Sequence, residues 1–399
     1  MAKFKIFLLV LMIVSAAGFY NPLGIVNAQL SKSIYYLSTV LLIIFGNNSV
    51  KLRQISKFPY ISYRMVLLGM IGAALMASFF QEQSLSVSIV AILPYFFGYL
   101  SLLSLFRSGI NEKDILKIIY SLVIISFVIY WINFITFPNM IFGTMDASEV
   151  DDSRGMVRLG VLYIELYVFL LYYSIEQWII SRQQKWLAII AICILMIVLS
   201  LARQVIVISA IMGCLYAVKK FVWFKKILFI GMVAFVVLYV VPEIPIYKAM
   251  VEVSEQQKEM NKTRDDPRIR CFNFYTDSYQ TNEFTKIFGN GVPSIGNSQW
   301  GIQFEKITRS EGVYSSDLGW IGFYYHFGLI AAIGVFFLLL KSALYSLRNG
   351  NLYISYFLIT IMLFCLLSAP ILIYRQVINI MLIIYLSYIT LNKKRCVQK

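Results

Sequence analysis

Two arginines in one long polar segment have a type and spacing that fit a chemical role. The segment runs from Pro242 to Ser316 in an otherwise apolar chain, and it carries Arg268 and Arg270. Guanidinium groups bind phosphate oxygens in bidentate fashion, and in a dry site they stabilise charge that grows on a leaving group. These arginines therefore indicate an anionic substrate. The competing interpretation is that both arginines are solvated and balance the negative charge of the neighbouring Asp265 and Asp266.

A third arginine, Arg203, lies in the middle of the apolar stretch 186–218. As a single helix this stretch would be about 50 Å long, against a hydrocarbon core of about 30 Å. We therefore expect a hairpin that turns near residues 200–204 and places Arg203 at the outer interface. An unsolvated charge there costs on the order of 2–3 kcal/mol, so Arg203 either clamps an anion in a cavity or snorkels to lipid headgroups. Arg375 lies between the last two apolar runs. Its side chain is interpreted either as facing the substrate or as structural.

Asp317 follows the polar segment and opens the next apolar run. A carboxylate at a membrane–water boundary could act as a general base, because partial burial raises its pKa. It could equally cap the helix that follows. The single histidine, His326, is interpreted as a packing residue. No group of His, Cys, Asp or Glu has metal-ligand spacing, and no serine–histidine or cysteine–histidine signature stands out, so we expect no metal and no cofactor.

The polar segment predicts a helix and then a glycine turn. Pro267 after two acids is a good helix start. Ile269, Phe272 and Tyr275 recur at helical spacing, which predicts an apolar face resting on the membrane domain. Gly289-Asn290-Gly291 follows and is interpreted as a mobile turn, with close backbone approach to a sugar or phosphate as the alternative.

Composition places the chain among membrane proteins. It has 399 residues, of which 59% are hydrophobic and 14% charged, with a mean hydropathy of +0.74, whereas a soluble domain has about 25% charged residues. A β-barrel would show alternating segments of about ten residues, and the chain does not. The net charge of +15 is scattered among short loops, which excludes a nucleic-acid patch. The five cysteines form no disulfide framework.

Apolar runs predict about twelve membrane-spanning helices. We therefore expect an all-α polytopic membrane protein, with residues 1–399 as a single membrane domain and 242–316 as a large extracytoplasmic loop. The first run resembles a signal peptide but is interpreted as an uncleaved span. The spans are expected at residues 4–20, 30–46, 60–80, 85–106, 115–137, 157–180, 186–201, 203–218, 226–241, 317–340, 352–368 and 371–390.

Charge placement predicts the orientation of these spans. Alternate loops are basic and the others are acidic, and basic loops stay in the cytoplasm. Both termini are therefore expected to be cytoplasmic, and the 242–316 loop is expected outside. The basic loops carry Lys51, Arg53, Arg107, Lys113, Arg182, Lys185, Lys219, Lys220, Lys341 and Arg348.

This order of features resembles the bacterial O-antigen polymerase (Wzy-type) and O-antigen ligase superfamily. The shared layout is about twelve spans, an arginine at the outer end of a mid-chain hairpin, and a late outer loop. That loop has an arginine-bearing helix before a Gly-x-Gly turn, here Arg270 and Gly289–Gly291. The next span typically begins with a polar residue and then reaches a glycine, here Asp317 and Gly328. Ligases usually carry histidine where this chain has Asp317, which favours a polymerase.

The resemblance implies a metal-independent glycosyltransferase with a membrane-embedded, class C-like fold. It would polymerise undecaprenyl-diphosphate-linked repeat units into O-antigen or capsular polysaccharide, at the outer face of the bacterial cytoplasmic (inner) membrane. Arg203, Arg268, Arg270 and Arg375 would bind the diphosphate. Arg203 and Arg270 would also be catalytic, and Asp317 would be the base or would position the acceptor.

The partners implied are the lipid-linked donor and acceptor glycans, the bilayer and a polysaccharide chain-length regulator. Three alternatives remain: an O-antigen ligase, a flippase or transporter of lipid-linked oligosaccharide, and a purely structural or sensory membrane protein, in which the clustered arginines would have no role. Transporters usually show pseudo-repeated halves and polar residues at the membrane midplane. This sequence instead concentrates its charge at the outer rim and in one loop.

Overall fold

The computed structural model describes residues 2–22, 25–46, 57–143, 159–200, 202–220, 267–278, 282–366 and 368–397. All the elements named for this part of the chain are helices. Contacts between residues divide the chain into two compact units, one formed by Met1–Ile125 with Pro267–Lys399 and the other by Ser126–Asp266.

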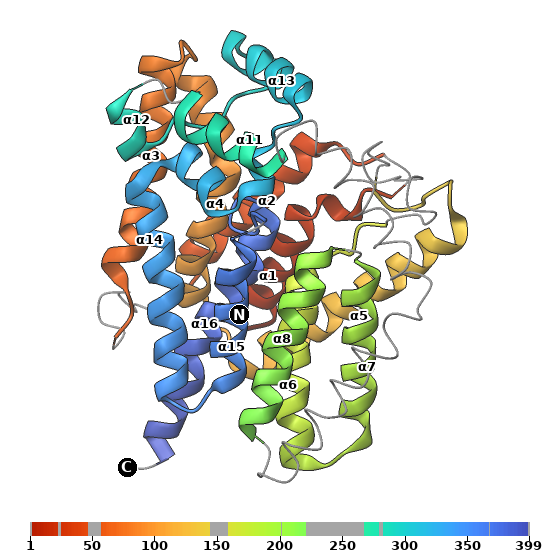
Figure 1. Ribbon diagram of the computed structural model, residues 1–399. Helices are drawn as coiled ribbons and strands as arrows, with labels where there is room; N and C mark the ends of the chain where they lie inside the picture. Colours follow the sequence, from red (N-terminus) through yellow and green to blue (C-terminus); the bar gives the residue numbers. More distant parts are fainter. Residues whose placement is uncertain are drawn as a thin grey trace. The chain divides into compact units, whose positions relative to one another are not determined.

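The first unit consists of long apolar helices with short helices gathered at one end. In Figure 1, α11, α12 and α13 lie together near one end of α3. The long helices are α1 (Ala2–Ala16), α2 (Ala28–Ile44), α3 (Tyr60–Phe80), α4 (Leu85–Ser108), the first half of α5 (Glu112–Thr136), α14 (Trp320–Arg348), α15 (Leu352–Phe364) and α16 (Tyr374–Val397). The short elements are η1 (Gly18–Tyr20), α11 (Pro267–Asn273), the π-helical turn η6 (Phe274–Ser278), α12 (Glu283–Phe288), α13 (Gln299–Glu311) and the 3-10 turn η7 (Ser315–Leu318).

The second unit contains the end of α5 together with α6 (Ile164–Ser181), α7 (Gln184–Leu199) and α8 (Arg203–Lys220). Helix α6 packs against α7 and α8. The break between α7 and α8 confirms that the apolar stretch 186–218 forms two helices. The predicted span 226–241 and the part of the predicted loop from 242 to 266 lie outside the described residues.

Several of these helices fit a bilayer. Helices α3, α4, α5 and α14 are long and apolar enough to cross a membrane, and α2, α7, α15 and residues 374–389 of α16 are shorter apolar helices. The protein is therefore a helical membrane protein. A count of twelve spans stays a prediction, because four of the described helices are long and apolar enough to cross a membrane and one predicted span lies outside the described residues.

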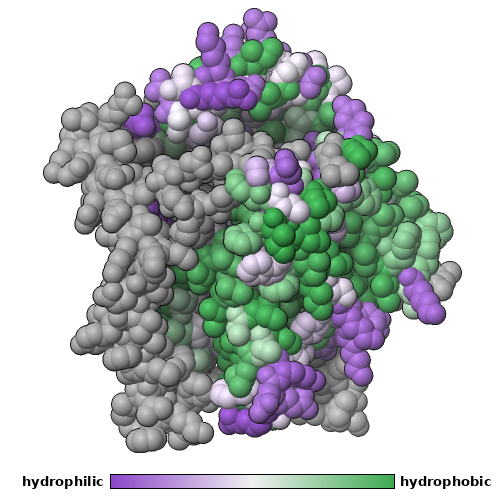
Figure 2. All heavy atoms as spheres, turned by 90° about the vertical axis from the view of Figure 1, so that its right-hand side faces the viewer, coloured by the Kyte–Doolittle hydropathy of each residue, from purple (hydrophilic) through white to green (hydrophobic). Residues whose placement is uncertain are grey.

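Helix α3 shows why the bundle suits lipid. Its exposed face carries Ile61, Leu68 and Phe79, with exposed fractions of 74%, 55% and 73%, while Val66 and Ala73 on the opposite face are fully buried. A helix that is apolar all round belongs in a membrane or in the core of a large protein. Figure 2 shows that apolar side chains cover much of the coloured surface in this view.

Helix α14 is broken at Gly328, where φ is +76° and ψ is 175°. The ring centroids of Trp320 and Phe336, eight residues on either side, are 5.9 Å apart. Residues sixteen apart in a continuous helix would be about 24 Å apart along the axis. The chain therefore folds back at Gly328, and the predicted tenth span 317–340 is wrong as one continuous helix. The long arm that could cross a membrane is residues 329–348.

Irregular backbone lies deep within this unit. The hydroxyl of Tyr99 donates to the carbonyl of Ile371, 3.2 Å away, in the turn between α15 and α16. Tyr99 is fourteen residues from the start of α4, so this turn lies about 20 Å below that start. The Trp320 amide donates to the Cys365 carbonyl in the same turn, at 2.8 Å. Non-helical backbone at such depth is tolerated in a bilayer where it is packed in protein or lines a polar cavity.

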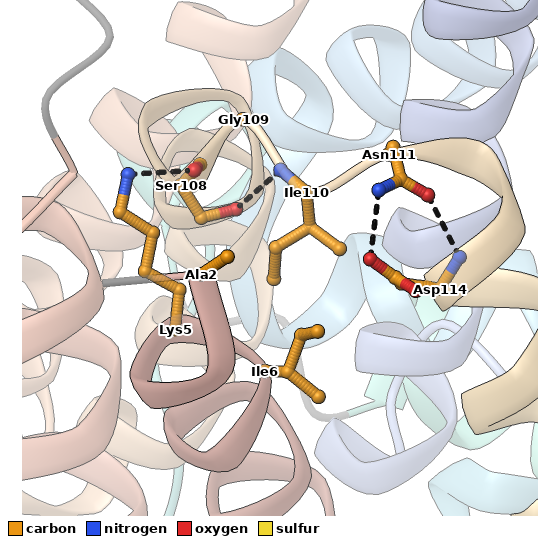
Figure 3. Close-up of a pocket in the computed structure, with 8 residues that line it drawn as sticks. All are labelled: Ala2, Lys5, Ile6, Ser108, Gly109, Ile110, Asn111 and Asp114. Atoms are coloured by element: carbon orange, nitrogen blue, oxygen red, sulfur yellow. Dashed lines mark hydrogen bonds between the residues drawn. The ribbon is translucent and has the colours of Figure 1, made fainter.

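A small pocket of about 150 Å³ lies where the start of α1 meets the turn between α4 and α5. Figure 3 shows Lys5 pointing to the Ser108 carbonyl, which accepts its hydrogen bond at 3.0 Å, and Asn111 paired with Asp114 at 2.7 Å. Asn111 also accepts from the Asp114 amide, as a helix cap does. The polar groups here stabilise the start of α5, so we assign this pocket a structural role.

Candidate functional site

The turn Gly289-Asn290-Gly291 is buried between α3 and α14, which corrects its interpretation as a mobile turn. The amides of Asn290 and Gly291 donate to the carbonyls of Tyr325 and His326, both at 2.9 Å. The side chain of Gln81 in the turn after α3 donates to the Asn290 side chain at 3.1 Å. The close approach of this backbone is to protein: a Cβ at Gly289 would lie 2.4 Å from the His326 carbonyl oxygen.

Gln83 forms hydrogen bonds to the segment 292–298, which follows this turn. Its side-chain oxygen accepts from the Ser294 amide at 2.9 Å and from the Ser298 hydroxyl at 2.8 Å, and its nitrogen donates to the Val292 carbonyl at 3.1 Å. The residue is 1% exposed. One side-chain amide therefore holds three polar groups of this partly buried segment.

Replacing Gln83 by alanine is expected to loosen residues 292–298. Each buried group left without a partner costs about 1–3 kcal/mol. Hydrogen exchange in detergent should show faster exchange of the Ser294 amide and its neighbours, while amides in α4 keep their rates. Glu82→Gln, a change at the exposed neighbouring position, is the control. Unchanged exchange in the Gln83 variant would contradict this role.

Helix α11 and the turn η6 pack on the first arm of α14 through a small core. The members of this core are Cys271, Tyr275, Phe304, Val313, Leu318 and Tyr325. The described part of the helix runs from Pro267, so its predicted start stays a prediction, but its apolar face is different. Ile269 and Phe272 are 56% and 46% exposed, because the helix is short and passes into a wider π-helical turn that brings Cys271 and Tyr275 inward.

Ser315 and His326 form the central contact of the site. The Nδ1 atom of His326 lies 2.9 Å from the Gly291 carbonyl oxygen, and its Nε2 atom lies 3.0 Å from the Ser315 hydroxyl. A carbonyl oxygen only accepts, so Nδ1 carries the proton. In the neutral ring Nε2 is then an acceptor, and Ser315 donates to it. His326 is buried, as a packing residue would be, but the sequence did not reveal its serine partner.

Tyr275 extends this contact. Its hydroxyl donates to the Val313 carbonyl at 3.2 Å. Burial raises the pKa of Tyr275 above its usual range, the nearby Cys271 and Asp317 raise it further, and the closeness of Ser315 opposes the rise. Ser315, Asp317 and Tyr275 therefore share one small region of the first unit.

Asp317 lies in the turn η7 and is exposed, whereas the sequence suggested partial burial. It does not cap α14, because the residue at the N-cap position is Gly319. A Cβ at Gly319 would lie 2.4 Å from the Ser368 carbonyl oxygen, so η7 runs directly to the turn between α15 and α16. The end of the predicted loop thus enters the bundle.

Arg270 lies on α11, which packs against η7. Its side chain is half-buried, and its Nε atom is buried without a hydrogen-bond partner. A buried donor without a partner is costly, and a bound anion would satisfy it. Arg268 lies on the same short helix, and its side chain lies outside the described part of the structure.

Arg375 is exposed in the first turn of α16. The ring of the preceding Tyr374 stacks on Tyr35, with centroids 5.9 Å apart, and meets Tyr95 edge-on at 6.5 Å. Tyr95 is ten residues into α4, so this group lies about 15 Å below the start of that helix. A charge at such depth among apolar helices usually faces a polar cavity and marks a substrate path.

Arg203 begins α8 in the second unit, directly after the break from α7. Part of its guanidinium group is buried. Arg270 and Arg375 belong to the first unit. Within the first unit, the structure brings the helix of Arg270 and the turn of Asp317 together and joins that turn to the one before Arg375.

The described residues contain no group of three or more His, Cys, Asp or Glu side chains that could hold a metal ion. The structure defines a helical membrane protein, and a polar cluster lies where its late loop enters the bundle. No known protein family matches this chain, and no curated protein matches it.

Proposed function

We propose that this protein is a membrane-embedded polysaccharide polymerase that joins undecaprenyl-diphosphate-linked repeat units at the outer face of the bacterial cytoplasmic membrane. The observation that carries the proposal is the entry of the late loop into the bundle. That entry places Asp317 beside the turn that leads to Arg375, and it seats the helix of Arg270 above it. Cationic and carboxylate groups in one region of a membrane protein suit a lipid diphosphate and a sugar hydroxyl.

The chemistry needs charge stabilisation more than it needs a cofactor. As the glycosidic bond breaks, negative charge grows on the departing lipid diphosphate. Arg270 and Arg375 would bind that charge, with Arg268 as a further ligand, and the binding strengthens towards the transition state. Asp317 would orient the attacking hydroxyl of the acceptor sugar or accept its proton.

The placement of basic residues supports an outward-facing site. Lys5, Arg107 and Lys113 lie around the end of the bundle where α1 begins and α4 ends. Helix α12 contacts α3 near the opposite end of the bundle, and α13 comes next in the chain. Because basic residues favour the cytoplasmic side, the cluster around Ser315 and Asp317 would face outwards, where lipid-linked units are polymerised.

A flippase or transporter of the same lipid-linked unit is a second candidate, favoured by the break in α14. Broken helices and polar groups deep in the bundle are features of transporters. The described residues of the two units do not repeat one helix arrangement: α14 folds back at Gly328, whereas α6, α7 and α8 in the second unit run without such a break. An O-antigen ligase remains the alternative within the transferase class.

A glycan gel from a deletion strain of the native host tests these functions. If the protein is a polymerase, each lipid acceptor should carry a single repeat unit, and the plasmid-borne gene should restore the ladder. Finished polymer held on the lipid carrier would indicate a ligase. Single units trapped on the inner face would indicate a flippase. An unchanged ladder would contradict all three functions.

A further inference from the structure

Ser315 and His326 have the geometry of a hydroxyl activated by a base. The serine oxygen is 3.0 Å from Nε2, and Nδ1 is held by the Gly291 carbonyl at 2.9 Å. The carbonyl fixes the ring in the tautomer whose Nε2 accepts a proton. A nucleophile or relay hydroxyl, a base and a group that orients the base are the three parts of such an arrangement.

The two residues also differ in access to solvent. His326 is 6% exposed, while Ser315 is half-buried. A substrate hydroxyl could therefore reach Ser315 but not the ring behind it. Asp317, two residues further along the same turn, is exposed and could hold the incoming hydroxyl by a hydrogen bond.

We propose that Ser315 and His326 form a proton relay that deprotonates the acceptor sugar. This inference rests on the proposed polymerase function and names the base within it. The acceptor oxygen forms the new bond to the anomeric carbon, and the bond from that carbon to the diphosphate oxygen breaks with its electron pair. The acceptor proton passes to Ser315 Oγ while the serine proton passes to His326 Nε2. The imidazolium then returns the proton to water through Ser315.

This relay assigns different roles to the residues of the cluster. Ser315 touches the substrate and is catalytic, His326 acts through Ser315, and Gly291 positions His326. Asp317 becomes a residue that orients the acceptor. The glycine turn is therefore more than a packing element, because its carbonyl selects the reactive tautomer.

Four variants separate the relay from a structural role. Ser315→Ala removes the hydroxyl. His326→Asn keeps an amide N–H that can reach the Gly291 carbonyl but has nothing at the Nε2 position. Ser315→Thr keeps a hydroxyl. Ser310→Ala, at an exposed serine that bonds only within its own helix turn, is the matched control.

The assay uses membrane vesicles from the deletion strain, which carry the host's own lipid-linked unit, with purified full-length protein added. Loss of a general base lowers the rate about 10²- to 10⁴-fold, so we expect that loss for Ser315→Ala and for His326→Asn. The double variant should be no slower than either single one, because the two residues act as a unit. Ser315→Thr and Ser310→Ala should retain the rate.

Solvent isotope effects give a readout that packing would not change. Because two protons move in the same step, the wild-type rate should be lower in D₂O than in H₂O. A plot of that rate against the deuterium fraction of the solvent should be curved rather than linear. If the wild-type protein makes no polymer in the vesicles, the proposed function is wrong. If it does and Ser315→Ala or His326→Asn keeps the wild-type rate, the relay is wrong and the function stands. Additive losses in the double variant would also overturn the relay.

Discussion

Replacing Arg270 by alanine is expected to slow polymerisation about 10²- to 10³-fold, the usual loss when one preorganised donor to a developing charge is removed. Its Nε atom is buried without a partner among the described residues, and a bound anion would satisfy this donor. Removing it also removes a buried donor, so folding should not suffer. The rate is measured as repeat units added per minute in vesicles, together with the thermal midpoint of the purified protein.

Two controls sharpen this prediction. Arg270→Lys keeps the charge but loses the bidentate geometry, so it should recover only part of the rate. Arg309→Ala removes an arginine whose side chain is 73% exposed and pairs with Glu305 one turn away. Such exposed pairs contribute about 0–1 kcal/mol, and the rate should not change. A full rate in the Arg270→Ala protein would remove this residue from the site.

Replacing Gly328 by alanine is expected to destabilise the whole first unit. A φ of +76° with ψ near 175° is a conformation that is essentially limited to glycine. A Cβ there would lie 2.3 Å from the Ile287 carbonyl oxygen and 2.4 Å from the Gly289 nitrogen. Neither backbone atom can move aside without opening the buried turn. We expect a cost of about 4 kcal/mol or more, the range of the largest single-residue effects.

The measurement is the thermal midpoint and the monodisperse fraction of the detergent-purified protein. Gly350→Ala is the matched control, because Gly350 also has a positive φ of 78° but has no atom within 4 Å of the added Cβ. That change carries only the backbone strain of about 1–2 kcal/mol. Equal midpoints for the two variants would show that Gly328 does not hold the turn in α14.

The sequence predicts the helices of this protein well, and for a clear reason. Bilayer-length apolar runs fix both the type and the approximate ends of α3, α4 and α5, since no other structure satisfies the backbone in lipid. The break before Arg203 follows from the same length argument. The predicted start of α11 at Pro267 follows from local chemistry, because proline is favoured in the first helical turn.

The site is less predictable because its contacts join residues that are distant in the chain. The pairing of Ser315 with His326 depends on the fold-back at Gly328, which no periodicity reveals. A polar Ser-Ser-Asp run shortly before the only histidine was the available signal, and it suggests no geometry. The exposure of Asp317 and the burial of Asn290 were likewise set by which backbone packs against them.

By itself the sequence determined a helical membrane protein, the position of most of its helices, and the residue types that suit an anionic substrate. These depend on hydrophobicity and local length, which each segment carries alone. Only the tertiary structure decided that the glycine turn is buried, that α14 folds back, and that a serine donates to the histidine. Such features arise from close packing between segments far apart in sequence, where a single Cβ or one carbonyl oxygen decides the outcome.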